Sequence, residues 1–405
     1  MRYLVWMDLR SGSSLLLWLS FLFIAAMALS GTFINIYIFR VDHSVAAIGK
    51  FNLFEYLAFP VAFWLAGKLS SRLPEIWFLR LGVILLTLFF VWLLSQGTAP
   101  KVDLALLGLL YGFGQGVYWY GFNTLSFDWT TWQTRAAFQS AMGFAGAIAT
   151  TVCPFLAGVI ISKSANYTGY YLVFALSLAL FGMLLLISAK ANHDLHGTRL
   201  NMREGYRFRG DPDWRRLWLG TVAFGAREGV YAFFVSLLAY SFTHSEEYFG
   251  TYSLVVGALS FMSFFVVGKF KKKKVSPKVY LNASACLLGG LSVLWAVVAS
   301  VAYLWVFGVC TALLLPLFMV SYQTMVFNEI EETKRSARHR SAYIISREMA
   351  LAIGRLAGVG LIWWASLALP WRGVITLYGL LGVSFAVTAL LVRKVQFRSQ
   401  KGAYP

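Results

Sequence analysis

The chain of 405 residues contains little charge. Only 13% of its residues are charged and 59% are hydrophobic, whereas soluble domains carry about 25% charged residues. The mean hydropathy is +0.67. A chain of this composition would expose large apolar patches in water. The composition therefore excludes a soluble enzyme, a nucleic-acid-binding protein, a secreted disulfide-rich domain and a disordered protein. It predicts a polytopic membrane protein.

Cysteine is scarce, and the sequence lacks motifs for nucleotide binding, zinc binding and nucleophilic catalysis. The three cysteines, Cys153, Cys286 and Cys310, all lie in apolar runs, which predicts buried single thiols. The sequence has no P-loop, no zinc-ligand spacing, no glycine-rich dinucleotide motif and no nucleophile elbow. We therefore expect neither an ATP-driven pump nor a membrane hydrolase, and we expect no enzyme activity, cofactor or metal.

Long apolar runs dominate the chain. A membrane helix needs about 20 mostly apolar residues, because the hydrocarbon core is about 30 Å thick and each helical residue rises 1.5 Å. Twelve such runs lie near 14–39, 46–69, 76–97, 102–125, 136–162, 167–189, 217–241, 248–270, 278–298, 302–326, 341–366 and 373–392. The first continues too far beyond its small residues to be a cleaved signal peptide. The only long polar connection divides the chain into a first half (1–189), a linker (190–216) and a second half (217–405).

The positive charges indicate the orientation. The formal net charge is +18, and most of the 35 lysines and arginines fall on the side that holds both termini and the linker. Only five lie in loops on the opposite side: Arg40, Lys50, Lys101, Lys163 and Arg372. Because lysine and arginine are retained on the cytoplasmic side, both termini are predicted to be cytoplasmic. The basic residues thus reflect topology and contact with anionic lipids, and no nucleic-acid partner is expected.

The two halves resemble each other at an offset of about 200 residues. The segment Leu156-Ala157-Gly158-Val159 is identical to Leu356-Ala357-Gly358-Val359. Gly49 aligns with Gly250, and Asn123-Thr124 aligns with Gln323-Thr324. Six helices per repeat return the chain to the same side, so the repeats are parallel and related by an axis along the membrane normal.

With twelve apolar runs and a parallel repeat, the chain resembles the major facilitator superfamily over nearly its full length. Its loop Gly67-Lys68-Leu69-Ser70-Ser71-Arg72 is similar to the hallmark loop between helices two and three of that family, with Ser71 where the family usually has aspartate. Gly143, Gly146, Cys153-Pro154 and Gly158 resemble a degraded form of the glycine–proline motif of its exporters. The resemblance implies an all-α integral membrane protein of 12 transmembrane helices, with two six-helix bundles around a central cavity that work by alternating access.

Six ionisable residues fall well inside the predicted spans: Glu55, Arg227, Glu228, Arg347, Glu348 and Arg355. Each would cost roughly 2.5–3.5 kcal/mol if it faced lipid. They are therefore expected to face protein or water. Their charges sum to zero, so they could be structural ion pairs that fix helices seven and eleven, or a polar site for substrate and protons.

Spacing on the eleventh helix favours a charged stripe. Glu348 and Arg355 are seven residues apart and share one helical face, and Arg347 lies nearby. In the resembled family, helices seven and eleven line the cavity. Arginine stays charged and offers paired donors to a carboxylate or phosphate. We therefore expect Arg227, Arg347 and Arg355 to bind substrate and Glu228 and Glu348 to carry protons.

The first half supplies further candidates. Glu55 shares its helical face with no cation of its own helix, so it is either a protonated, inert group or a proton-coupling site. Helix four carries a polar and aromatic face, predicted to be either substrate-binding or ordinary packing: Gln115, Tyr118, Trp119 and Asn123. Asn35 on helix one is a further candidate contact with substrate. Gly108, Gly112 and Gly116 form a small-residue stripe that favours close helix packing.

A cytoplasmic gate is expected near the fourth helix. Asp128 and Arg135 bracket the connection between helices four and five, and Arg72 lies across from them in the arrangement of the resembled family. The alternative is a surface salt bridge of little energetic consequence.

The sequence thus predicts a multi-pass protein of the plasma membrane that acts as a secondary active transporter. Its expected partners are a small organic or amphipathic substrate, protons and the lipid bilayer, and it is expected to function as a monomer. The motif of helix five favours export. A lipid or glycolipid flippase on the same fold and a non-transporting scaffold or receptor remain alternatives.

Overall fold

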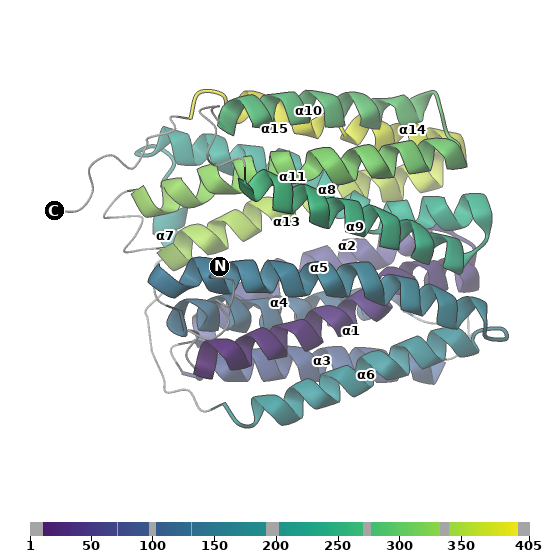
Figure 1. Cartoon of the computed structure of the whole chain (residues 1–405), viewed down its shortest axis with the longest axis horizontal. Coiled ribbons are helices and arrows are strands. Elements are labelled where there is room, and N and C mark those ends of the chain that lie inside the picture. The colour runs from purple at the N-terminus through teal and green to yellow at the C-terminus, as the bar shows by residue number, and fades with distance from the viewer. Residues whose placement is uncertain are drawn as a thin grey trace. The chain divides into compact units, whose positions relative to one another are not determined.

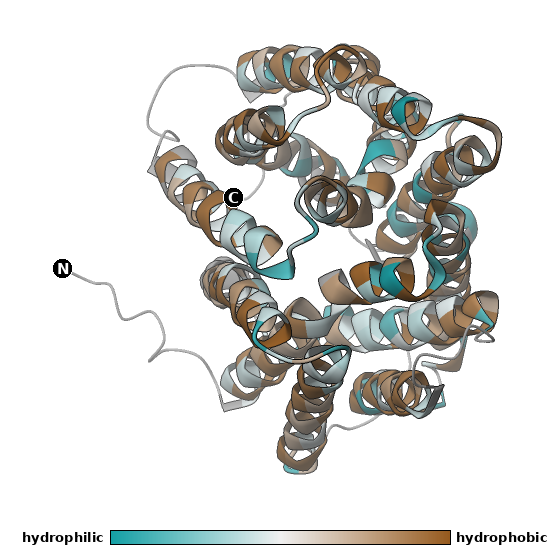
Figure 2. Cartoon of the chain, turned by 90° about the vertical axis from the view of Figure 1, so that its right-hand side faces the viewer, coloured by the Kyte–Doolittle hydropathy of each residue, from teal (hydrophilic) through white to brown (hydrophobic). Residues whose placement is uncertain are grey.

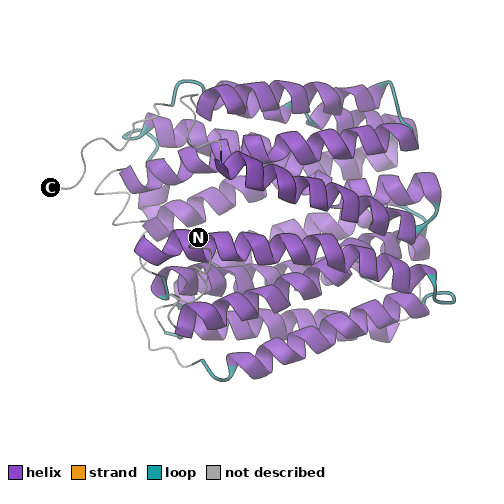
Figure 3. Cartoon of the chain, viewed as in Figure 1, coloured by secondary structure: helices purple, strands orange, loops and turns teal. Residues whose placement is uncertain are grey.

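A computed structural model of the chain describes residues 11–70, 72–96, 103–130, 132–191, 202–269, 277–332 and 340–395. Regular structure in these ranges is helical throughout, and they contain no strand (Figure 3). Ten helices within them are long and apolar enough to cross a membrane. The predicted class, an all-α integral membrane protein, is therefore confirmed.

The helices follow the order that the apolar runs predict (Figure 1). The first half forms α1 Ser11–Asp42, α2 Val45–Leu69, α3 Glu75–Gln96, α4 Leu104–Asp128, α5 Trp132–Ser162 and α6 Thr168–Ser188. The linker contributes the short helix α7 Met202–Gly205. The second half forms α8 Pro212–Thr243, α9 Glu246–Lys269, α10 Pro277–Val293, the 3-10 turn η3 Leu294–Ala296, α11 Val301–Glu332, α13 Arg340–Ala368, α14 Trp371–Leu381 and α15 Ser384–Val392.

The structure contains ten candidate membrane spans in its described residues, whereas the sequence predicts twelve. Each expected range overlaps a helix, but α4 and α9 are not among the ten spans found in the described residues. In α4 the reason is composition, since glycine, Gln115 and Asn123 lower its hydropathy. The last span is interrupted at Gly382, between α14 and α15, where an added Cβ would overlap the side chain of Ser292. The 12-helix, two-bundle arrangement stays a prediction.

Glycines bring α4 unusually close to α2. A Cβ at Gly108, Gly112 or Gly116 would overlap backbone oxygens of Phe51, Glu55 and Phe59 on α2, respectively. Only glycine allows two helix backbones to approach in this way. The predicted packing role of this stripe is confirmed, and α4 is sheltered by α2 on one side and α3 on another.

The internal repeat is also visible in two turns. His43, after α1, and His244, after α8, both adopt the left-handed conformation, with φ of 50°. Each donates its backbone N–H to the residue four positions earlier, Phe39 or Tyr240. Each is followed by a serine whose hydroxyl caps the next helix, Ser44 for α2 and Ser245 for α9. The same His-Ser turn therefore recurs at the same place in both halves, a signal that the sequence comparison missed.

The chain forms two compact units whose boundaries differ from those of the sequence halves. Unit 1 comprises residues 1–199, 231–261 and 300–305, and unit 2 comprises 200–230, 262–299 and 306–405. The later part of α8 and the earlier part of α9 thus belong to unit 1, although they lie in the second half of the sequence. Apolar residues, drawn in brown, recur along the helices (Figure 2).

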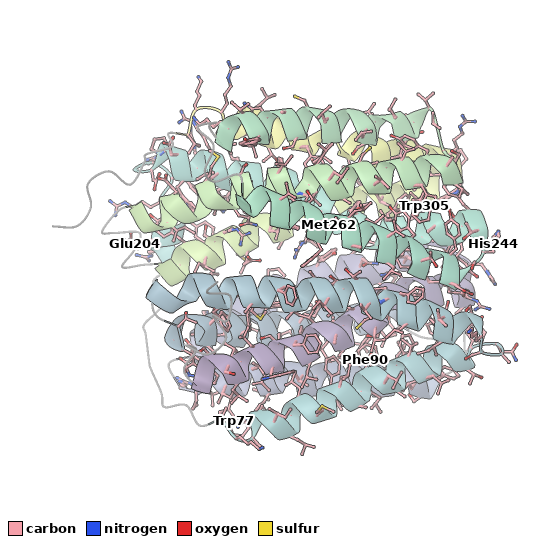
Figure 4. All side chains as sticks on the ribbon, viewed as in Figure 1. Trp77, Phe90, Glu204, His244, Met262 and Trp305 are labelled. Carbon is pink, nitrogen blue, oxygen red and sulfur yellow. The ribbon has the colours of Figure 1, made fainter. Side chains whose placement is uncertain are left out.

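Aromatic side chains fill the interior of unit 1. Phe90, labelled in Figure 4, makes ring contacts with Phe89, Phe174 and Phe181 and is fully buried.

The exposure of the cysteines differs from the prediction. Cys286 is exposed, and Cys153 and Cys310 are half-buried. The expectation of buried thiols is wrong for Cys286, because a helix in a membrane protein also presents an apolar face outward, to lipid.

Candidate functional site

The candidate site in unit 2 lies at a glycine-lined crossing of α8 and α13. A Cβ at Gly354 or Gly358 of α13 would overlap backbone oxygens of Val222 and Ala226 on α8. In the other direction, a Cβ at Gly225 would overlap the backbone oxygen of Leu351. With so little space between the backbones, side chains at this level reach directly from one helix to the other.

An arginine–glutamate pair spans this crossing. Arg355 on α13 donates to Glu228 on α8 through two bonds, from Nε to Oε2 at 2.5 Å and from Nη2 to Oε1 at 3.1 Å. Two parallel bonds of this kind are the strong, oriented form of an arginine–carboxylate contact. Gly229 packs directly against Arg355, because a Cβ at this position would lie 2.9 Å from the Cα, Cβ and Cγ atoms of Arg355. The Glu228 side chain is 32% exposed and that of Arg355 is 18% exposed, so the carboxylate remains accessible.

A second charged group lies nearer the beginning of α13. Arg347 donates from Nη1 to Oε1 of Glu348 at 2.9 Å and from Nη2 to Oε1 of Gln323 on α11 at 3.0 Å. Both charged side chains are only about one-sixth exposed. At 1.5 Å per residue, Arg347 lies roughly 12 Å along the helix from Arg355. The charged stripe predicted on the eleventh helix is therefore present as two separate pairs.

Gln323 is a site residue that the sequence reasoning missed. The internal repeat could have indicated it, because the alignment of the two halves places Gln323 opposite Asn123, which was a candidate. The sequence offered no reason to pair a neutral amide on α11 with a charged residue on α13. Only the contact between the two side chains supplies that reason.

Arg227 is placed differently from its neighbour Glu228. It is 3% exposed, and its guanidinium carbon lies 4.7 Å from the ring centroid of Phe385 on α15. This is the geometry of a cation–π contact. Arg227 is thus packed inside unit 2, and its contact with substrate stays a prediction.

Glu55 lies in unit 1 and is hydrogen-bonded to an amide. Gln115 on α4 donates from Nε2 to Oε1 of Glu55 on α2 at 2.8 Å. This bond lies at the glycine crossing of α2 and α4, where Gly112 abuts the backbone oxygen of Glu55. The other five ionisable residues of the predicted spans, three arginines and two glutamates, lie in unit 2. The six charges that sum to zero in the sequence are therefore divided between the two units, and the charges of unit 2 do not cancel.

The other candidates of the first half divide into packed and accessible residues. Tyr118 is 1% exposed, and its ring stacks on Phe23 at a centroid distance of 3.4 Å. Asn35 is 7% exposed and accepts a bond from Nδ2 of Asn52 at 2.7 Å. Both side chains are thus packed within unit 1, which agrees with the packing alternative for Tyr118, and their contact with substrate stays a prediction. Gln115, Trp119 and Asn123 are half-buried and retain some exposed surface.

The expected gate residues lie near helix ends: Arg72 follows α2, Asp128 ends α4 and Arg135 belongs to α5. Arg72 and Asp128 are both exposed. Arg135 lies in the first turn of α5, but its side chain lies outside the described residues. The gate therefore remains a sequence prediction.

Comparison with known proteins identifies the family. The sequence model of the Major Facilitator Superfamily matches residues 16–337. The chain is also 30% identical over 398 residues to the uncharacterized protein YqgE of Bacillus subtilis (strain 168), covering 98% of this chain and 92% of that protein. The chain belongs to the major facilitator superfamily. It is thus a multi-pass membrane protein of a superfamily of secondary transporters, not of a family of enzymes.

Further similarities agree with membership of the superfamily. An uncharacterized protein encoded in the sodM 3′ region of Geobacillus stearothermophilus is 36% identical over 160 residues, covering 40% of this chain and 75% of that protein. Two crystal structures of the nucleoside transporter NupG, one of them of a mutant, align with a TM-score of 0.71. The first covers 96% of this chain and 100% of that chain at 14% sequence identity. At that identity the likeness shows the fold.

Proposed function

We propose that the chain is a proton-coupled secondary transporter of a small organic solute that carries an anionic group. Transport proceeds by alternating access in the plasma membrane, with both termini cytoplasmic. The observation that carries the proposal is the two-bond pair of Arg355 and Glu228 at the crossing of α8 and α13. Family membership supports transport, and the pair supports the choice of substrate and coupling ion.

The charges of unit 2 favour an anionic solute. In the membrane-spanning middle of α8 and α13, three arginines stand with two glutamates, an excess of one positive charge. Arginine remains protonated at physiological pH and presents a planar fork that matches a carboxylate or phosphate. Arg355 is the substrate-binding residue of the proposal, and Arg347 with Gln323 is a second contact.

Glu228 is proposed as the proton-carrying group because it competes with the solute for Arg355. While Glu228 is ionised, it accepts from two of the five N–H donors of the Arg355 guanidinium, on Nε and Nη2. Protonation removes its charge and releases these donors to an anionic solute. Proton and solute then bind together, which is positive coupling between two ligands of one site. Glu348 plays the same role toward Arg347, and Glu55 with Gln115 is a separate protonation site in unit 1.

Joint binding of an anion and a proton predicts cotransport, which an inward proton gradient drives as uptake. The glycine–proline pattern of α5 instead favours export. The direction of flux in purified protein reconstituted into liposomes under an imposed pH gradient separates the two.

A thermal-shift screen tests the proposal first. Purified protein is melted with carboxylate, phosphate, neutral and cationic solutes and with lipids at about pH 5.5 and 7.5. A solute at 100 times its dissociation constant adds about 2.7 kcal/mol to the free energy of unfolding. We expect an anionic class to raise the melting temperature more at the lower pH.

Two variants make the screen specific. Arg355→Ala should abolish the shift, whereas Arg216→Ala should retain it, because Arg216 pairs with Asp213 near the beginning of the same helix as Glu228. A shift by lipids alone would favour the flippase. Loss of stability in Arg355→Ala without a solute-dependent shift in the parent protein would favour the non-transporting scaffold.

A further inference from the structure

The later part of the linker between the two repeats is fixed to unit 2. Its short helix α7 lies beside the beginning of α13 (Figure 1). The backbone oxygen of Gly205 accepts one bond from Ser346 Oγ at 2.7 Å and another from Trp214 Nε1 at 3.0 Å. A Cβ at Gly205 would lie 2.3 Å from the backbone oxygen of Ala342. The turn that contains Gly205 is therefore held directly against α13, in a position that only glycine allows.

Aromatic side chains complete this attachment. Trp214 is 1% exposed, and its ring centroid lies 4.9 Å from that of Tyr343 on α13. Phe208, which follows α7, contacts the ring of Trp218 on α8 at 5.3 Å between centroids. The Trp218 indole in turn donates from Nε1 to the backbone oxygen of Ser346 at 3.0 Å. The segment 202–218 thus packs as one structure against α13, and its remaining side chains lie at the surface.

The charged side chains that this segment exposes are all arginines: Arg203, Arg207, Arg209 and Arg215. Its three carboxylates are instead half-buried: Glu204, Asp211 and Asp213. Asp211 accepts a bond from the backbone N–H of Trp214 at 2.8 Å. Asp213 accepts a bond from Nη1 of Arg216 at 2.6 Å. The exposed surface of the segment is therefore positive.

This positive surface lies where lipid headgroups are expected. Arg215 stands just before the predicted span 217–241, on the side of the membrane that the lysine and arginine distribution predicts to be cytoplasmic. Tyr206, next to Arg207, is 39% exposed. Tyrosine combines an apolar ring with a polar tip and is enriched at membrane–water interfaces. An exposed tyrosine among exposed arginines is therefore typical of a surface that contacts a bilayer.

The end of α15 extends the positive surface. A Cβ at Gly220 of α8 would lie 3.1 Å from Cγ1 of Val392, the last residue of α15. The first part of α8 and the end of α15 are therefore adjacent. Arg393 and Lys394, which follow α15, are exposed. Cations from the linker, α8 and α15 thus gather at one end of unit 2, and clusters of cations beside a membrane span are typical of sites for anionic lipid headgroups.

We propose that four arginines of the docked linker, Arg203, Arg207, Arg209 and Arg215, form a binding site for the phosphate headgroup of an anionic phospholipid. The planar fork of arginine matches the oxygens of a phosphate group. The linker site differs from the general attraction of basic loops to lipid, because contacts to α13 hold its arginines in place before the lipid binds and so lower the cost of ordering them. It goes beyond the proposed transport function, since it needs no solute.

Lipid binding to the purified, delipidated protein tests the linker site. The probe is phosphatidylglycerol, the reference is phosphatidylcholine with the same acyl chains, and native mass spectrometry gives the dissociation constant of the first bound lipid. Phosphatidylglycerol should bind at least about tenfold more tightly, and high salt should reduce this preference. Arg207→Gln should weaken its binding about fivefold, which corresponds to about 1 kcal/mol. Arg207→Lys, which keeps the charge, should retain most of the affinity.

Two controls make the result specific. Arg372, at the beginning of α14, is an exposed arginine of unit 2 on the predicted opposite side of the membrane, so Arg372→Gln should leave the affinity unchanged. Inorganic phosphate at the same concentration should not displace the lipid. The linker site is rejected if both lipids bind equally or if Arg372→Gln weakens binding as much as Arg207→Gln. Displacement by inorganic phosphate would also overturn it, because the surface would then be a site for free anions.

A further variant tests whether the site depends on the docked turn. Ser346→Ala removes the side-chain bond to Gly205 but keeps every arginine. Limited digestion with trypsin should then cut faster after Arg207, and the affinity for phosphatidylglycerol should fall about two- to threefold, as expected for the loss of one hydrogen bond. Faster cleavage with unchanged affinity would overturn a preformed site. None of these measurements uses transport, so a protein without flux in liposomes could still show the linker site.

Discussion

The crossing of α2 with α4 and the crossing of α8 with α13 have the same architecture but different chemistry. Each is lined by glycines that bring two backbones into contact, and each carries one carboxylate at the point of contact. At the first crossing Glu55 meets the neutral amide of Gln115. At the second, Glu228 meets the permanent charge of Arg355. The comparison separates the energy of close packing, which the crossings share, from the energy of an ion pair, which only one of them has.

Packing should give the largest effect at both crossings. Gly358→Leu and Gly112→Leu each force a side chain into a neighbouring backbone oxygen, so each should lose about 3 kcal/mol or more of stability. Melting temperature and the yield of monodisperse protein measure the loss. Gly182→Leu on α6 is the control, because a Cβ there meets nothing within 4 Å, and it should gain about 0.5–1 kcal/mol from helix propensity. Equal tolerance of all three changes would show that the crossings are not close.

The ion pair should give the next largest effect, and only at the second crossing. Arg355→Ala leaves the carboxylate of Glu228 without its two donors, so about 1–3 kcal/mol should be lost. The partial exposure of Glu228 keeps the loss below that of a fully buried pair. Thermal unfolding in detergent checks this, with Arg216→Ala as the matched variant. A loss no greater than that of Arg216→Ala would mean that the pair contributes little.

Removal of the amide partner should be milder. Gln115→Ala deletes one hydrogen bond to Glu55, and such a bond contributes about 0.5–1.5 kcal/mol. The expected drop in melting temperature is smaller than that of Arg355→Ala measured in the same detergent. A drop as large as that of Arg355→Ala would imply that Glu55 is held as an ion that depends on Gln115.

The smallest effect should come from Glu55→Gln. An amide keeps the shape of the carboxyl group and still accepts the bond from Gln115, so stability should stay within about 0.5 kcal/mol. Solute-driven proton uptake in liposomes, read with a pH dye, shows whether Glu55 nevertheless carries a coupled proton. A large loss of stability would assign Glu55 a structural role instead.

The sequence predicted the helical class, the position of nearly every helix and the family, because apolar length and charge asymmetry are properties of single segments in a bilayer. It also predicted the packing role of Gly108, Gly112 and Gly116, since spacing alone places them on one face. It did not predict the partners of the charged residues. Arg227 and Glu228 are neighbours in the chain, yet one lies over Phe385 and the other reaches Arg355, because consecutive residues on a helix point about 100° apart.

The ion pair of Arg40 on α1 with Glu246 on α9 shows the same limit. In the sequence analysis Arg40 was counted as a loop cation, and Glu246 lay just before the predicted span 248–270, so neither was a candidate. They are 206 positions apart, and only folding brings them to 2.9 Å. Segment-level quantities, namely hydropathy, length, charge bias and repeat, are fixed by the sequence because the membrane acts on each helix separately. Which charge meets which partner was decided by the tertiary structure, because it depends on how helices distant in the chain rotate and cross.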